Sequence, residues 1–196
     1  SFCNKKNITL IEDNAHGYGG KLNGKLLGTY GDFGISSPRK IFDVYSGGVL
    51  HNNKRKQIKK FDLIDYKISR LEKIKRKVNK SPKIKSVLKF LFLKRPRYEN
   101  PKAFQNFRLK DYLIDDYSKR IIENSDLNET KIKYQKKYNR IERFVLKNNL
   151  KPVFKSIHPE SIPWCLPVYT SSFQETKTWF KWGWKNNKAI FSWPSL

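Results

Sequence analysis

An acidic pair and a histidine lie close together near the start of the chain. Glu12 and Asp13 directly follow the apolar run of residues 8–11, and His16 comes three residues after Asp13. A short continuous apolar run predicts a buried parallel strand, and open α/β sheets bind ligands at the ends of such strands. We expect an acid and an imidazole to meet a ligand there. A helix cap or surface carboxylate, and a structural histidine, are the alternative interpretations.

A second polar cluster follows further along the chain. Ser36 and Ser37 are followed by Lys40, and a Gly47-Gly48 pair comes after it. Hydroxyls and loop amides can hold a phosphate group, and Lys40 supplies an amine. A basic loop in a lysine-rich chain is the alternative interpretation.

Together the two clusters hold the groups that a pyridoxal phosphate (PLP) enzyme requires. The cofactor needs an amine for a Schiff base, an acid against its pyridine nitrogen and donors for its phosphate. The acid keeps that nitrogen protonated, so that the ring can accept electrons from the substrate carbanion. The sequence therefore favours a PLP site over either cluster acting alone.

Short strands and turns are predicted around these clusters. Residues 17–34 are rich in glycine, and Asn23-Gly24 predicts a hairpin. Further strands are expected over residues 33–36 and 46–50.

The character of the chain changes at residue 54. Residues 54–99 carry 18 basic and 4 acidic side chains, and apolar residues in steps of three and four predict helix. Helices are expected over residues 58–78, 84–93, 109–124, 129–148 and 172–184, and later strands over 153–154, 164–169 and 189–193.

The motifs resemble the DegT/StrS family of PLP-dependent sugar aminotransferases, which have the aspartate aminotransferase-like fold type I. Residues 11–16 (IEDNAH) are similar to its I-E-D-A-A-Q/H strand end, and residues 28–34 (GTYGDFG) to its G-x-x-G-D segment. Lys40 is followed by Gly47-Gly48 at the family's spacing. Residues 164–169 and 191–194 are similar to its small domain, less specifically.

The resemblance implies an α/β fold and a division of the chain. Residues 1–105 would be the C-terminal part of a three-layer α/β/α large domain that binds PLP, together with the basic helices. Residues 106–196 would form a partial α+β small domain, truncated at its end. Family members are homodimers, and their large domain starts well upstream. We therefore expect this chain to be an internal fragment, and its lack of methionine agrees with that expectation.

The resemblance also implies roles for individual residues. Asp13 would pair with the pyridinium, His16 would contact the ring or its 3-hydroxyl, and Ser36 or Ser37 would bind the phosphate. Lys40 would form the Schiff base and then move the proton. The family's usual serine, five residues before the lysine, is replaced by Ile35, so the choice between the two serines stays open.

The implied activity is transfer of an amino group from an amino acid such as glutamate to a keto sugar, which family members use in nucleotide-linked form. Some relatives carry histidine in place of the lysine and act as dehydratases, so Lys40 favours transamination. One alternative to this activity is that the chain is a truncated fragment without any activity.

Composition supports a second alternative. The chain of 196 residues is 38% apolar, has a formal charge of +25 and carries far more Lys than Arg. Such charge suggests a nucleic acid or an anionic surface as partner for the helices of residues 54–99, although an AT-rich coding sequence gives the same bias. Those helices lack interleaved aromatics or a base-reading Arg cluster, which argues against specific nucleic-acid binding.

The two cysteines are far apart and have no histidine at metal spacing. They predict neither a disulfide framework nor a metal site, and they fit a reducing cytoplasm. The longest apolar stretch is too short to cross a bilayer, so no membrane partner is expected.

Overall fold

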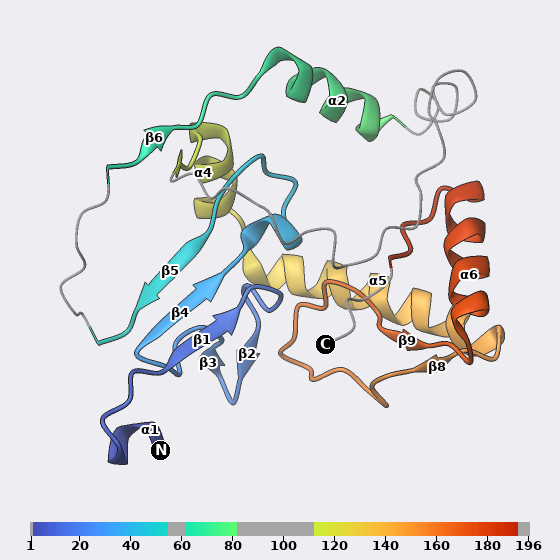
Figure 1. Ribbon diagram of the computed structural model, residues 1–196, viewed down its shortest axis with the longest axis horizontal. Coiled ribbons are helices and arrows are strands. Elements are labelled where there is room, and N and C mark those ends of the chain that lie inside the picture. The colour runs from blue at the N-terminus through green and yellow to red at the C-terminus, as the bar shows by residue number, and fades with distance from the viewer. Residues whose placement is uncertain (1, 55–61, 82–111, 192–196) are drawn as a thin grey trace. The chain divides into compact units, whose positions relative to one another are not determined.

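The computed structural model describes residues 2–54, 62–81 and 112–191. Its contacts divide the chain into two units, Ser1–Lys67 with Asp111–Tyr169, and Ile68–Lys110 with Thr170–Leu196. The first unit contains α1 (Phe2–Lys5), β1 (Ile11–Asn14), β2 (Lys21–Leu22), β3 (Lys25–Leu26), β4 (Phe33–Ser36), the short 3-10 helix η1 (Pro38–Lys40), β5 (Val49–Asn52), β6 (Ile64–Asp65), β7 (Tyr112–Leu113), α4 (Asp116–Glu123), α5 (Leu127–Lys147), β8 (Lys151–Pro152) and β9 (Val168–Tyr169). The second unit contains α2 (Arg70–Lys80) and α6 (Phe173–Lys185) (Figure 1).

A three-stranded sheet in the order β1-β4-β5 positions the candidate site (Figure 1). β1 and β4 are parallel, with Asn14 opposite Ser36, whereas β5 returns antiparallel to β4. The strand predicted over residues 33–36 is confirmed, and the predicted return strand begins at Val49. The sheet thus has one parallel pair, whose two carboxyl ends lie at one edge.

The predicted hairpin is confirmed as β2 and β3, with Lys21 opposite Leu26. Its two turn residues, Asn23 and Gly24, both have positive φ, of 51° and 76°. This is the conformation that an Asn-Gly turn adopts readily, and its twist matches that of the two strands.

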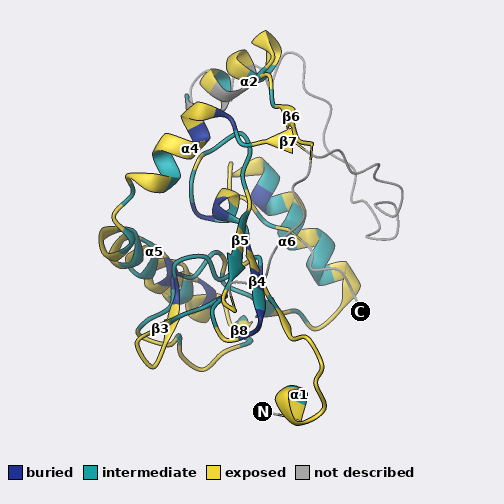
Figure 2. Cartoon of the chain, turned by 90° about the vertical axis from the view of Figure 1, so that its left-hand side faces the viewer, coloured by how far each residue is buried: buried dark blue, intermediate teal, exposed yellow. Residues whose placement is uncertain are grey.

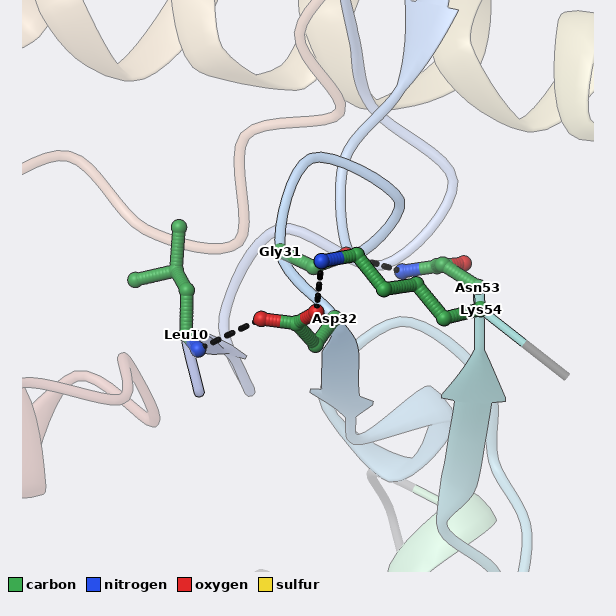
Figure 3. Close-up of polar contacts among 5 residues, drawn as sticks. All are labelled: Leu10, Gly31, Asp32, Asn53 and Lys54. Carbon is green, nitrogen blue, oxygen red and sulfur yellow. Dashed lines mark hydrogen bonds and ion pairs between the residues drawn. The ribbon is translucent and has the colours of Figure 1, made fainter. Parts of the chain in front are cut away.

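Gly31 and Asp32, in the segment of residues 28–34, link the start of β1 to the end of β5 through polar contacts (Figure 3). Asp32 is 3% exposed; its carboxylate accepts a hydrogen bond of 2.7 Å from the Leu10 amide and forms an ion pair with Lys54. The Asn53 side chain donates to the Gly31 carbonyl at 3.0 Å. Asp32 therefore fixes the entry to β1 and the exit from β5 from a single position.

The strand predicted for the apolar run of residues 8–11 was wrong in its bounds and its burial. β1 begins only at Ile11 and ends at Asn14, and Ile8 and Ile11 are 50% and 59% exposed. A continuous apolar run predicts burial on both faces, but within the described residues one face of this sheet is uncovered. Ile35 and Leu50, which are opposite each other, are exposed on it as well.

Helix α5 is the longest helix of the first unit, and its start follows from a capping residue. The Asp126 carboxylate accepts hydrogen bonds from the amides of Asn128 and Glu129, as expected of an N-cap. Tyr138 and Val145 are its buried residues, and most of its other positions are exposed (Figure 2). The helix predicted over residues 129–148 is confirmed, two residues longer at its start. The helix predicted over 109–124 is confirmed only as α4, because Tyr112–Leu113 pair with β6.

In the second unit, α6 confirms the helix predicted over residues 172–184, and the Ser172 hydroxyl caps it by accepting from the Glu175 amide. Helix α2 covers only the end of the helix predicted over 58–78. It starts at Arg70 because Ser69 and Glu72 form a capping box there. The helix predicted over 84–93 lies outside the described residues. Residues 189–191 are not a strand, and 192–193 lie outside the described residues.

The later strands of the first unit are shorter than expected. Lys151–Pro152 pair with Val168–Tyr169. The first of these strands ends just before the predicted residues 153–154, and the second covers only the last two residues of the predicted strand 164–169. A mixed α/β fold is confirmed. The three-layer large domain, the small domain and the boundary near residue 105 remain predictions.

Candidate active site

The ends of β1 and β4 bring the two polar clusters of the sequence to one edge of the sheet. These strands are parallel neighbours, so the segments that follow them, residues 15–16 and 37–40, both leave at their carboxyl ends. Ligands in open α/β sheets bind at such an edge. Asp13 is the penultimate residue of β1, and Lys40 is the last residue of η1.

The Asp13 carboxylate is exposed at this edge. Its Oδ1 accepts a hydrogen bond of 3.0 Å from the Ala15 amide, which closes the turn after β1. In the described part of the chain, no Lys or Arg forms an ion pair with it. The carboxylate can therefore accept a hydrogen bond from a protonated ring nitrogen.

The His16 and Lys40 side chains meet on a third residue, Trp164. The imidazole of His16 is stacked on the indole, with ring centroids 4.7 Å apart and planes 5° from parallel. The Nζ atom of Lys40 lies 4.4 Å from the centroid of the same indole. An imidazole and an amine that are separate in the sequence are thus brought together in space.

The backbone of Lys40 is fixed by its neighbours. Pro38 is fully buried and Ile41 is 5% exposed, and the Lys40 amide donates to the Ser37 carbonyl at 3.1 Å. The Ile41 carbonyl accepts a hydrogen bond from the Tyr134 hydroxyl on α5, and burial raises the pKa of that phenol. The half-buried Lys40 side chain therefore starts from an anchored position.

The two candidate serines lie in different surroundings. Ser36 is 1% exposed, accepts a hydrogen bond of 3.1 Å from the Asn14 side chain and lies 3.2 Å from Nε2 of His51. Ser37 is half-buried, stands directly before η1 and makes no capping hydrogen bond with its side chain. The hydroxyl of Ser36 belongs to a structural network, whereas Ser37 lies at the sheet edge and its hydroxyl does not cap η1.

The loop before Gly47-Gly48 is fastened to the start of α4. Ser46 donates to the Asp115 carboxylate at 2.6 Å, and the Ser118 hydroxyl accepts from the amides of Tyr45 and Ser46. Burial disfavours the charged form of Asp115, but hydrogen bonds from Ser118 and Ser46 outweigh it and hold its pKa below the ordinary value. Asp115 is thus an ionised anchor for this loop.

Cys165 follows Trp164 and lies near the amine. Burial raises the pKa of its thiol, and the positive charge of Lys40 acts in the opposite direction. The phenol of Tyr138 also has a raised pKa, because it is buried and because Glu142 and Cys165 are nearby. A thiol with a raised pKa is protonated at neutral pH and is a poor nucleophile.

Trp164 is the site residue that the sequence did not single out. Its position in an apolar run predicts a strand, and no spacing rule connects it with residues 16 or 40. Only the folded chain shows this contact, because it joins segments that are far apart in the sequence.

Helices combined with a parallel strand pair, and a carboxylate, an imidazole and an amine at the strand ends, are typical of α/β enzymes. Residues 1–88 match the model of the DegT/DnrJ/EryC1/StrS aminotransferase family. This match confirms the family resemblance over a segment that contains Asp13, His16, Ser36, Ser37 and Lys40. No curated protein and no solved structure matches the chain.

Two further findings concern the described residues alone. None of their helices is long and apolar enough to span a membrane. Among the same residues, no three His, Cys, Asp or Glu side chains are grouped so that they could hold a metal ion.

Proposed function

We propose that this chain is the part of a PLP-dependent aminotransferase that carries the reactive lysine. One observation supports this most strongly: the Lys40 amine and the His16 imidazole contact the same indole. They do so at the strand edge where Asp13 presents its carboxylate. The family of residues 1–88, which is one of aminotransferases, supports the same reaction class.

The chemistry of the donor groups fits PLP. An exposed carboxylate suits a protonated pyridine nitrogen, an amine suits the aldehyde, and a hydroxyl suits the phosphate. We assign these roles to Asp13, Lys40 and Ser37. Ser36 is less suited to the phosphate because its hydroxyl is buried and already paired with Asn14 and His51.

PLP, when bound, supplies an electron sink for the carbanion formed at the substrate's Cα. Asp13 would hold a proton on the ring nitrogen. Lys40 would hold the aldehyde through Nζ, and the same amine could accept and donate a proton. His16 would contact the ring or its hydroxyl.

The donor is an amino acid such as glutamate, and the acceptor is a keto sugar in nucleotide-linked form. The family resemblance supports this assignment, and a lysine rather than a histidine at position 40 supports transamination over dehydration. By the same resemblance the full-length protein would be a homodimer, and the two widely separated cysteines fit a reducing cytoplasm.

Replacing Lys40 tests the proposal. The chain is titrated with PLP while the visible absorption band of the bound cofactor is followed. We expect Lys40→Ala to abolish the shift of that band, because the variant removes the amine that contacts the same indole as His16. Lys25→Ala, in the exposed hairpin, is the matched control and retains the shift. An unchanged shift in Lys40→Ala would contradict the assignment.

A second candidate function, unspecific binding of nucleic acid, is favoured by one feature of α5. The exposed residues Lys133, Lys136, Arg140, Arg143 and Lys147 follow one another at steps of three or four, which places them on one face. Like charges at this spacing destabilise a helix unless an anion binds to them. An open surface hollow of about 470 Å³ on α5 is lined by Lys136, Lys137, Asn139, Arg140 and Arg143.

Neutralising this face tests the second candidate. The triple variant Lys136→Gln, Arg140→Gln, Arg143→Gln is compared with Lys21→Gln, Lys151→Gln, Lys155→Gln, which removes the same charge elsewhere. Binding of polyuridylate is measured by fluorescence anisotropy at several salt concentrations. We expect the slope of log K against log salt to fall by about 2 in the α5 variant alone. Equal slopes in the two variants would show that binding follows net charge rather than α5.

A further inference from the structure

Trp164 contacts two of the proposed catalytic groups and yet lies outside the segment that the family match covers. Its indole is stacked on His16 and lies 4.4 Å from Nζ of Lys40. The match ends at residue 88, so nothing in it assigns a role to Trp164.

Hydrogen bonds anchor the segment that carries Trp164 to the turn between β2 and β3 and to α5. The Glu160 carboxylate accepts from the Gly24 amide at 3.0 and 3.1 Å. The Gln135 side chain on α5 donates to the carbonyls of Pro159 and Ser161, at 2.8 and 3.0 Å.

Ile162, two residues before Trp164, is 3% exposed. These anchors fix the backbone next to the indole, so Trp164 is presented to Lys40 by a held segment and not by a free loop.

An anchored indole restrains both reactive side chains. The protonated Lys40 side chain is attracted by the quadrupole of the indole face, and this contact places Nζ at the edge before the proton is lost and the amine can react. Lysine loses more rotamer freedom than most residues when its side chain is fixed. The parallel stack similarly restricts the orientation of the His16 ring. The freedom that Lys40 gives up on Trp164 does not have to be lost again when Nζ reacts.

We propose that Trp164 is a positioning residue for Lys40 and His16. Its indole holds the amine and the imidazole together at the strand edge, so that an aldehyde arriving there meets an oriented amine. This inference rests on the proposed function, because it assigns an aldehyde-binding role to Lys40. It goes beyond that function by assigning a role to a residue of the later part of the chain.

The test compares Trp164→Leu, which removes the aromatic face, with Trp164→Phe, which retains one. Phe154→Leu, at an exposed aromatic of the same segment, is the matched control. Two quantities are measured with PLP: the rate at which a borohydride-stable adduct forms on Lys40, and the circular dichroism of the bound cofactor band. We expect Trp164→Leu to slow adduct formation about threefold to thirtyfold and to weaken the dichroism. Trp164→Phe and Phe154→Leu stay within about twofold of the wild type.

A cofactor-free measurement checks the contact itself. Ring currents of the indole shift the proton resonances of His16 and of the Lys40 side-chain end in the wild-type chain. Loss of those shifts in Trp164→Leu, with the other resonances retained, supports the contact in a folded protein. Identical shifts in the two proteins would overturn it.

The outcomes separate the two proposals. An adduct on Lys40 that forms at the same rate in wild type and Trp164→Leu overturns the role of Trp164 and leaves the proposed function standing. A wild-type chain that forms no adduct on Lys40 overturns both.

Discussion

Lys40 is held at the sheet edge chiefly by the residues on either side of it. The buried Pro38 and Ile41 fix its backbone, and the indole of Trp164 meets its amine. The Ser36 side chain differs from that of Lys40, because its buried hydroxyl already contacts the side chains of Asn14 and His51. Residue type alone makes both serines candidates for a phosphate, and only their surroundings separate them.

Asp115 makes the stability of the first unit depend on pH. Its pKa is held below the ordinary value because, although burial opposes its charge, hydrogen bonds from Ser118 and Ser46 favour it. A group of this kind stabilises the fold above its unfolded pKa of about 3.9 and loses that contribution as the pH falls through the folded pKa. We expect the free energy of unfolding to fall as the pH is lowered below about 4.

The variant Asp115→Asn isolates this contribution. At neutral pH it should lower the free energy of unfolding by about 1 kcal/mol, because the hydrogen bonds from Ser46 and Ser118 are then made to a neutral group and not to a charged one. It should also flatten the decrease below pH 4 that denaturant titrations show for the wild type. Asp65→Asn, at an exposed strand position, is the control. A profile for Asp115→Asn that parallels the wild type would contradict the role given to Asp115.

At the level of elements, β4 depends on a close approach that only glycine permits. A Cβ on Gly34 would lie 1.9 Å from the carbonyl oxygen of Gly28, far inside any real contact. Gly28 itself has a φ of +92°, so the turn has little freedom to move away. The carboxylate of Glu12 also holds this turn, through the amides of Gly28 and Tyr30.

We therefore expect Gly34→Ala to lower the free energy of unfolding by about 3 kcal/mol, at the upper end of what overpacking costs. Gly48→Ala is the control, because its nearest contact would be the Ser36 carbonyl at 3.8 Å and its φ is not positive. Denaturant unfolding of both variants measures the difference. Equal stabilities would show that β4 can shift away from the Gly28 turn.

Local signals decided which elements the sequence could predict. The Asn23-Gly24 turn gives its hairpin, and Asp126 and Ser172 stand where α5 and α6 begin. The bounds of β1 were missed because an apolar run cannot show whether one face of a sheet or both will be covered. The start of α2 was missed because periodicity extended the helix across the capping signal at Ser69.

The candidate site was predictable only in the part that lies close together in sequence. Asp13, His16 and Lys40 could be identified because two neighbouring strands deliver them to one edge. Trp164 could not, since its contacts depend on how Glu160 and Ile162 anchor a distant segment. Such contacts come from tertiary packing, for which the local pattern around Trp164 gives no signal.

At the scale of the whole chain, the described residues enclose only a small core, which is partly polar. The described residues bury five apolar side chains, Pro38, Ile41, Tyr138, Val145 and Ile162, beside five polar ones, Asn14, Asp32, Ser36, Asp115 and Ser118. Much of the first unit is thus held by hydrogen bonds that also order the site. The formal charge of +25 is independent of that site and bears on the second candidate function alone.

The measurement that tests the central claim most directly is mapping the lysine that PLP modifies. The chain is incubated with PLP, reduced with borohydride, digested and analysed by peptide mass spectrometry. With 32 lysines in the chain, unspecific labelling would spread over many peptides. The account predicts one dominant pyridoxyl adduct, on Lys40. A dispersed pattern, or a dominant adduct on another lysine, would contradict it.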